Sequence, residues 1–140
     1  MKIVINKCFG GFGLSYEAIM LYAKLKKFKL YAFTEKRDKE GKINFNIFEK
    51  YNPKKHKTSF IHYSKKPLCK NGKYVKLSYF SEHDIDRTDN CLIRAVEQLG
   101  EKANGDYAKL KIIEIPDGIN YEISEYDGIE SIEECHNSWS

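Results

Sequence analysis

The sequence lacks the features that mark membrane-spanning and disulfide-bonded proteins. No apolar run approaches the roughly 20 residues that a helix needs to cross a bilayer, and the mean hydropathy is −0.60. The four cysteines are far apart and include no C-x-x-C pair, and the opening MKIVINKC contains no secretory apolar region. These absences argue against a membrane partner and favour a reducing cytoplasm as the location.

Complete ligand-binding motifs are also missing. The bend at 10–15, with the sequence GGFGLS, matches neither G-x-x-x-x-G-K-[ST] nor the full G-x-G-x-x-G, because Tyr16 stands where the third glycine of the latter would fall. Cys135 and His136 are adjacent, but no partner pair has the spacing of a zinc site. The sequence therefore predicts no metal, cofactor or catalytic residue, and it favours a binding protein over an enzyme.

The charge is divided along the chain, although the net charge is only +4. Residues 1–80 carry 19 Lys and Arg against 5 Asp and Glu, a net charge of +14, whereas residues 81–140 carry 5 against 15, a net charge of −10. Such a division predicts a surface that attracts polyanions, or acidic and basic faces that meet within the fold or between copies of the chain. Self-association is therefore left open.

The length of 140 residues fits one domain, and its first 28 residues predict a strand, a bend and a helix. Three consecutive β-branched residues at 3–5 favour a buried strand. Ser15 is the expected N-cap of the helix, which is followed by a second strand at 30–33. A right-handed crossover would place these two strands parallel in one sheet.

The rest of the chain predicts a basic β-rich insert or arm at about 36–78 and a second group of elements after it. Short strands near 59–63 and 74–80 are expected to form a hairpin. A helix carrying Leu92 and Val96 follows, capped by Asp86 or Thr88, and strands at 109–115 and 119–123 form another hairpin. Residues 127–130 have the form of a capping box, which predicts a short last helix from which Trp139 folds back on the core.

The predicted fold class is thus α/β, in the broader sense α+β. It is a single domain over 1–140 with a mixed sheet and about three helices. The element order is β-α-β, the basic β insert, then α-β-β-α.

Backbone amides gathered where the first strand becomes the first helix predict an anion site, since a helix N-terminus favours negative charge. A purely structural bend with an N-cap explains the same residues and stays open. Lysines of the insert can neutralise phosphates, and its aromatic residues can stack on bases. The predicted ligand-binding residues are Lys7, Gly10, Gly11, Phe12, Gly13, Ser15, Lys55, Lys57, Tyr63, Lys65, Lys66 and Tyr74.

Three segments resemble a known group of proteins: the opening MKIVINKCFGGFGLS, the segment DIDRTDNCLIRAVEQLG and the ending AKLKIIEIPDGINYEISEYDGIESI. They are similar to short, mostly uncharacterised proteins of bacteriophages and prophages. The resemblance leaves 36–78 unmatched, and Ser131 stands where a tryptophan is expected. It implies an accessory protein made in the cytoplasm of a bacterial host and acting by binding, and it implies no catalytic residue.

Three functional hypotheses follow. The first is a non-catalytic binder of a nucleotide, nucleic acid or another phosphate-bearing ligand in counter-defence. The second is an inhibitor of a host defence nuclease, such as an anti-CRISPR protein, whose acidic C-terminal part imitates nucleic acid. The third is a small metal-dependent hydrolase or nuclease that uses His83, Asp84 and Asp86, although the favoured interpretation is that Asp86 or Thr88 caps the following helix and the remaining carboxylates are solvated near its start.

Overall fold

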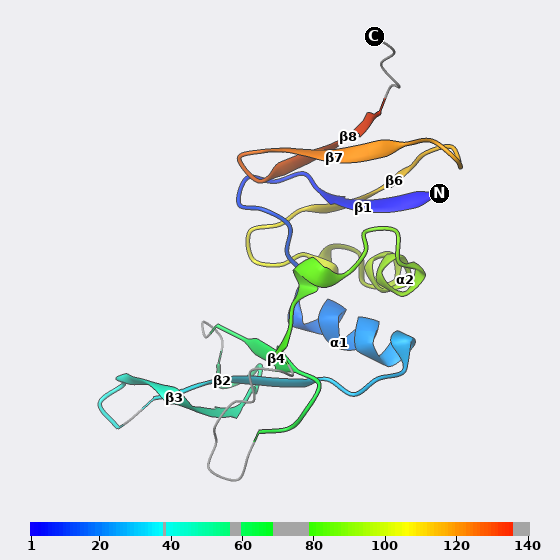
Figure 1. The fold of residues 1–140 in the computed structure, drawn as a ribbon. Helices are drawn as coiled ribbons and strands as arrows, with labels where there is room; N and C mark the ends of the chain where they lie inside the picture. Colours follow the sequence, from blue (N-terminus) through cyan, green and yellow to red (C-terminus); the bar gives the residue numbers. More distant parts are fainter. Residues whose placement is uncertain (38, 57–59, 69–78, 136–140) are drawn as a thin grey trace. The chain divides into compact units, whose positions relative to one another are not determined.

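The computed structural model describes residues 1–37, 39–56, 60–68 and 79–135, and the chain divides into two compact units (Figure 1). Unit 1 comprises Met1–Lys26 and Glu82–Ser140, and unit 2 comprises Lys27–Ser81. Unit 2 thus contains the whole of the predicted insert and also the strand expected at 30–33. The expectation of a single domain stays a prediction.

Unit 1 holds both α-helices of the described chain and four of its strands. Strand β1 pairs antiparallel with β6, from Lys2↔Glu114 to Asn6↔Leu110, and β7 pairs antiparallel with β8, from Tyr121↔Glu134 to Tyr126↔Ile129. Its elements in chain order are β1 (Lys2–Asn6), α1 (Tyr16–Lys26), a 3-10 turn (Glu82–Asp84), α2 (Asn90–Leu99), a second 3-10 turn (Gly100–Ala103), β6 (Leu110–Glu114), β7 (Tyr121–Tyr126) and β8 (Ile129–Glu134).

The core of unit 1 is built from β1 and one face of each helix. The β-branched residues Ile3, Val4 and Ile5 are almost completely buried, which confirms the predicted buried strand. Helices α1 and α2 pack together (Figure 1). They bury Ala18, Ile19, Tyr22 and Ala23 from α1 and Leu92, Ile93, Ala95 and Val96 from α2.

The helix starts follow the expected chemistry, with one correction. The Ser15 hydroxyl accepts a hydrogen bond from the Ala18 amide at 3.1 Å, so Ser15 is the predicted N-cap of α1. The predicted caps of α2, Asp86 and Thr88, are wrong. Asp89 caps this helix, because its carboxylate accepts from the amides of Cys91 and Leu92 at 2.8 and 3.3 Å, whereas Asp86 accepts from Thr88 itself.

The predicted last helix is wrong, and so is the hairpin predicted between 109–115 and 119–123. Asp127 and Gly128 have φ values of +52° and +91° and form the two-residue turn between β7 and β8. An Asp-Gly pair favours a hairpin turn of this kind because both central residues need positive φ. Strand β6 is therefore free to pair with β1. The predicted packing of Trp139 lies outside the described residues.

Unit 2 is a four-stranded sheet in the order β3-β2-β4-β5. Its strands are β2 (Tyr31–Arg37), β3 (Ile43–Lys50), β4 (His62–Ser64) and β5 (Tyr79–Phe80). Every strand pair in the described chain is antiparallel, so the predicted parallel pairing of the first two strands and the mixed sheet are wrong. The crossover rule needs both strands in one sheet, and β1 and β2 belong to different sheets. The predicted pairing of strands near 59–63 and 74–80 is confirmed where β4 and β5 overlap these ranges, whereas residues 59 and 74–78 lie outside the described residues.

Candidate functional site

Close backbone packing explains the glycines of the bend at 10–15. Gly10 and Gly11 have φ values of +119° and +97°, which side-chain-bearing residues rarely adopt. A Cβ on Gly10 would lie 2.7 Å from the Cβ of Tyr107, and a Cβ on Gly105 would lie 2.8 Å from the carbonyl carbon of Gly13. The bend and the segment at 103–107 are also joined by the hydrogen bond from the Gly105 amide to the Gly13 carbonyl, at 2.9 Å.

The chain itself supplies the anion at this bend. The Leu14 amide donates to Oε2 of Glu82 at 2.7 Å, and the Ser15 amide donates to the Ala103 carbonyl at 2.9 Å. The Ser15 hydroxyl donates to the Lys102 carbonyl at 2.6 Å. These contacts support the structural explanation of the bend. The prediction that Gly10, Gly11, Gly13 and Ser15 hold a ligand stays a prediction, and the geometry gives it no added support.

Glu82 has an unusual environment for a carboxylate. Burial raises the pKa of Glu82 above its ordinary value, and the Leu14 hydrogen bond and the nearby His83 oppose this shift without cancelling it. A carboxyl group of this kind costs stability when it is ionised in the folded chain. The stability that the protonated Glu82 contributes is therefore lost as the pH rises through this raised pKa.

A buried ion pair lies behind Phe12. Arg87 donates from Nη1 and Nη2 to Oε1 and Oε2 of Glu130 at 2.6 and 2.9 Å, and its guanidinium carbon lies 3.5 Å from the centroid of the Phe12 ring. The Phe12 side chain is buried, so its ring is covered by the chain's own cation and is not exposed for stacking on a base.

Asn6 is the second centre of this polar network. Its fully buried side chain donates from Nδ2 to the carbonyls of Cys8 and Gly128, both at 2.7 Å, and accepts at Oδ1 from the amides of Cys8 and Lys109. Its own amide donates to Oε1 of Glu130 at 2.8 Å. Asn6 thereby ties together the ends of β1 and β6 and the turn before β8.

Burial alone would raise the pKa of Glu130, but the hydrogen bonds from Arg87 and Asn6 and the Arg87 charge hold this pKa below its ordinary value. Asn6, Glu82, Arg87 and Glu130 were not predicted as site residues. Their partners lie up to 124 positions away in the sequence, and no local pattern signals such pairings. Their arrangement is that of a structural clamp.

In unit 2 the predicted site residues differ in accessibility. Lys55, Lys65 and Lys66 are exposed. The Lys55 ammonium lies 3.8 Å from Glu49, and the Lys65 ammonium lies 5.1 Å from the centroid of the Phe28 ring. Tyr63 is buried, so the geometry gives no support to the prediction that its ring stacks on a base, which stays a prediction. Lys57 and Tyr74 lie outside the described residues.

A hydrogen-bonded loop follows β3. Nε2 of His56 lies 2.8 Å from Oε1 of Glu49, and Nδ1 accepts from the Asn52 amide at 2.9 Å, so the proton of the neutral ring is on Nε2. The His56 hydrogen bond holds the pKa of Glu49 below its ordinary value. This loop orders the lysines at 54–55 on a defined backbone.

No group of three His, Cys, Asp or Glu side chains in the described part of the chain is placed to hold a metal ion. His83, Asp84 and Asp86 are included in this finding, so the geometry adds no support to the metal-dependent hydrolase hypothesis. Among the described residues there is also no helix long and apolar enough to cross a bilayer.

The fold and these sites define a mixed α+β protein with antiparallel sheets, one acidic unit and one basic unit. No family model, curated protein or solved structure matches the chain.

Proposed function

We propose that unit 2 binds nucleic acid or another phosphate-bearing polyanion without catalysing a reaction on it. The observation that carries the proposal is the distribution of charge between the two units. Unit 2 has 15 Lys and Arg against 4 Asp and Glu, a net charge of +11, whereas unit 1 has 9 against 16, a net charge of −7. A compact unit with this excess of cations attracts phosphates and releases their counterions.

The exposure of the charged groups supports the proposal. Every lysine and arginine that the structure describes in unit 2 is exposed. Of the described carboxylates, Glu35 and Glu49 are half-buried, and each faces a histidine: Glu49 is bonded to His56, and Glu35 lies 3.8 Å from His62. The accessible surface of unit 2 is therefore more positive than its net charge alone suggests.

An exposed aromatic ring offers a place for a base. Phe60 is 74% exposed, and its ring meets the edge of His62 at a centroid distance of 5.1 Å. The Thr34 hydroxyl donates to the Phe60 carbonyl at 3.0 Å and holds its backbone against β2. Stacking of a base on such a ring contributes about 1–3 kcal/mol, which favours single-stranded nucleic acid as the polyanion.

The test is fluorescence anisotropy with a labelled single-stranded oligonucleotide at low salt. Lys54 and Lys66 are exposed and form no ion pair within the described residues. We expect the double variant Lys54→Ala with Lys66→Ala to bind about tenfold more weakly. The matched control, Lys24→Ala with Lys102→Ala, removes the same charge from exposed positions of unit 1 and is expected to change affinity by less than about twofold. Equal losses in both variants would reject unit 2 as the binding surface.

A second candidate function has one specific observation in its favour. The β7–β8 hairpin exposes Glu122 and Glu133 directly opposite each other, and Glu125 and Glu134 are exposed on the same hairpin. Like charges in a cross-strand pair destabilise a hairpin, and such a surface fits a basic nucleic-acid-binding site on another protein. We propose, as the alternative, that unit 1 inhibits a nuclease by imitating nucleic acid.

The alternative is tested by binding to an immobilised CRISPR nuclease in competition with DNA. Charge reversal at Glu122 and Glu133 should abolish DNA-competitive binding. Glu130 is unsuitable for this test, because it is buried against Arg87 and its reversal would unfold unit 1. Binding that persists after reversal of the exposed pair would remove the alternative.

A further inference from the structure

A hollow of about 400 Å³ in unit 1 is lined by Lys7, Lys109, Leu110 and Lys111. Lys7 follows β1, and the other residues lie at the start of β6. The Lys7 amide donates to the Lys109 carbonyl at 2.8 Å, so these two residues are neighbours across the strands. All three lysines are exposed. The sequence interpretation placed Lys7 at the glycine bend, whereas the structure groups it with two lysines that sequence reasoning did not select.

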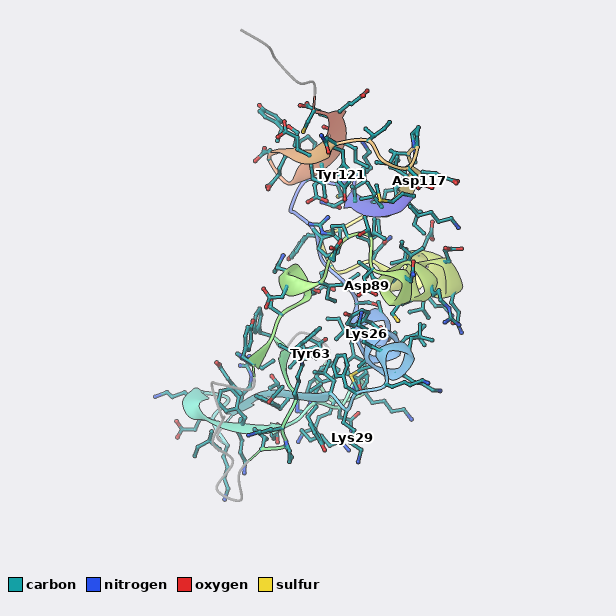
Figure 2. The ribbon with its side chains drawn as sticks, turned by 45° about the vertical axis from the view of Figure 1, so that its right-hand side comes forward. Lys26, Lys29, Tyr63, Asp89, Asp117 and Tyr121 are labelled. Atoms are coloured by element: carbon teal, nitrogen blue, oxygen red, sulfur yellow. The ribbon has the colours of Figure 1, made fainter. Side chains whose placement is uncertain are left out.

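The three charges are not balanced within the described residues. Lys2 pairs with Glu97 and Lys26 pairs with Asp89 (Figure 2), but no carboxylate of the described chain lies within 4.0 Å of the ammonium groups lining the hollow. Like charges that face each other on neighbouring strands repel. Unit 1 as a whole is acidic, with 16 Asp and Glu against 9 Lys and Arg. A group of three lysines without a carboxylate partner is therefore unusual in this unit.

The backbone below the hollow is fixed. Oδ1 of the fully buried Asn6 accepts from the Lys109 amide at 2.9 Å and from the Cys8 amide at 3.2 Å. The positions from which Lys7 and Lys109 project are therefore held on both strands before any ligand arrives, and this preorganisation reduces the entropic cost of binding.

Two exposed aromatic rings lie next to these lysines in the chain. Phe9 is 63% exposed and follows Lys7 by two positions, and Tyr107 is 76% exposed and precedes Lys109 by two. The two segments lie side by side, because a Cβ on Gly10 would be 2.7 Å from the Cβ of Tyr107. An exposed ring beside clustered cations suits a ligand that joins an aromatic base to a phosphate.

We propose that the hollow binds the phosphate group of a nucleotide whose base stacks on Phe9 or Tyr107. The nucleotide is either free or part of a single strand, since both carry the same phosphate and base. This site lies wholly within unit 1, so it does not depend on polyanion binding by unit 2.

The test is calorimetry of the full chain with inorganic phosphate, adenosine monophosphate and a short single-stranded oligonucleotide. We expect Lys7→Ala and Lys109→Ala each to weaken adenosine monophosphate binding about tenfold, the loss of one charge-assisted hydrogen bond. Lys102→Ala, an exposed lysine of the same unit outside the hollow, should leave it unchanged. Phe9→Ala with Tyr107→Ala should weaken adenosine monophosphate binding while binding of inorganic phosphate stays the same.

The oligonucleotide distinguishes the two sources. If the oligonucleotide binds more tightly than adenosine monophosphate and Lys7→Ala weakens that binding, the ligand is a single strand. If the oligonucleotide binds equally or more weakly than adenosine monophosphate, the ligand is a free nucleotide. Adenosine monophosphate binding that is insensitive to Lys54→Ala with Lys66→Ala separates this site from unit 2. The proposal would be overturned if neither inorganic phosphate nor adenosine monophosphate gave any heat of binding. It would also be overturned if Lys102→Ala weakened adenosine monophosphate binding as much as Lys7→Ala does.

Discussion

Replacing Glu130 by alanine is expected to destabilise unit 1 severely. The Glu130 side chain is 7% exposed and receives two hydrogen bonds from Arg87, at 2.6 and 2.9 Å, and one from the Asn6 amide, at 2.8 Å. Its removal leaves the buried Asn6 amide without this acceptor and leaves the largely buried guanidinium with the Val4 carbonyl, at 3.3 Å, in place of a charged partner. Breaking a buried pair in this way costs about 3–5 kcal/mol. Glu133→Ala, an exposed change on the same strand, is expected to stay within about 0.5 kcal/mol.

Hydrogen exchange of the slowest amides of α2 measures this loss, because it reports the opening of unit 1 separately from unit 2. A loss of about 3 kcal/mol or more corresponds to exchange that is roughly 150-fold faster or more. The amide of Asn6 is not used, since the substitution removes its own partner. Exchange in Glu130→Ala within a factor of about two of Glu133→Ala would refute the role of the ion pair.

Because the pKa of Glu130 is below its ordinary value, its stabilisation is present at neutral pH and is lost as the pH falls through that lowered pKa. Glu130→Gln should therefore be less stable than the wild type at pH 7 and approach it in acid. The hydrogen-exchange experiment repeated across pH checks this, and a gap that widens toward low pH would contradict it.

Three further predictions concern unit 1. Gly128→Ala should lower the unfolding free energy by about 3 kcal/mol or more, because the new Cβ would lie 2.4 Å from the Gly11 nitrogen. The control Gly118→Ala has a similar φ but no neighbouring atom within 4 Å, so it should lower the unfolding free energy by about 1 kcal/mol. A denaturant titration measures both values. Asp89→Ala should lower the stability of α2 by about 1–2 kcal/mol and Asp89→Asn by less, measured by exchange of α2 amides. Glu82→Gln should leave the unfolding free energy unchanged or raise it at pH 7, since it removes a buried carboxylate whose pKa is raised. The difference from the wild type should vanish in acid. A lower unfolding free energy than the wild type at pH 7 would contradict this.

Local signals in the sequence predicted much of the fold. The β-branched residues at 3–5 and Ser15 as an N-cap are each recognised by chemistry within a few residues, and the structure confirms them. The same local reasoning failed at Asp127 and Gly128, because a capping box and a hairpin turn compete for that sequence.

Pairings between distant segments could not be predicted. The pairing of β1 with β6 and the clamp of Asn6, Arg87 and Glu130 join residues that are far apart in the chain. The sequence did indicate that basic and acidic residues are segregated. The basic and acidic parts of the chain follow the structural units and not a single division at residue 80, because Met1–Lys26 belongs to the same unit as the acidic segment.

The proposed function is tested most directly by the salt dependence of oligonucleotide binding to the full chain. The logarithm of the binding constant should fall linearly with the logarithm of salt concentration, with a slope of about −0.7 for each phosphate neutralised. Substitution of Lys54 and Lys66 together should make the slope shallower by one to two such steps, while the paired control at Lys24 and Lys102 leaves it unchanged. Absence of binding at low salt, or a slope that responds equally to both pairs, would contradict polyanion recognition by unit 2.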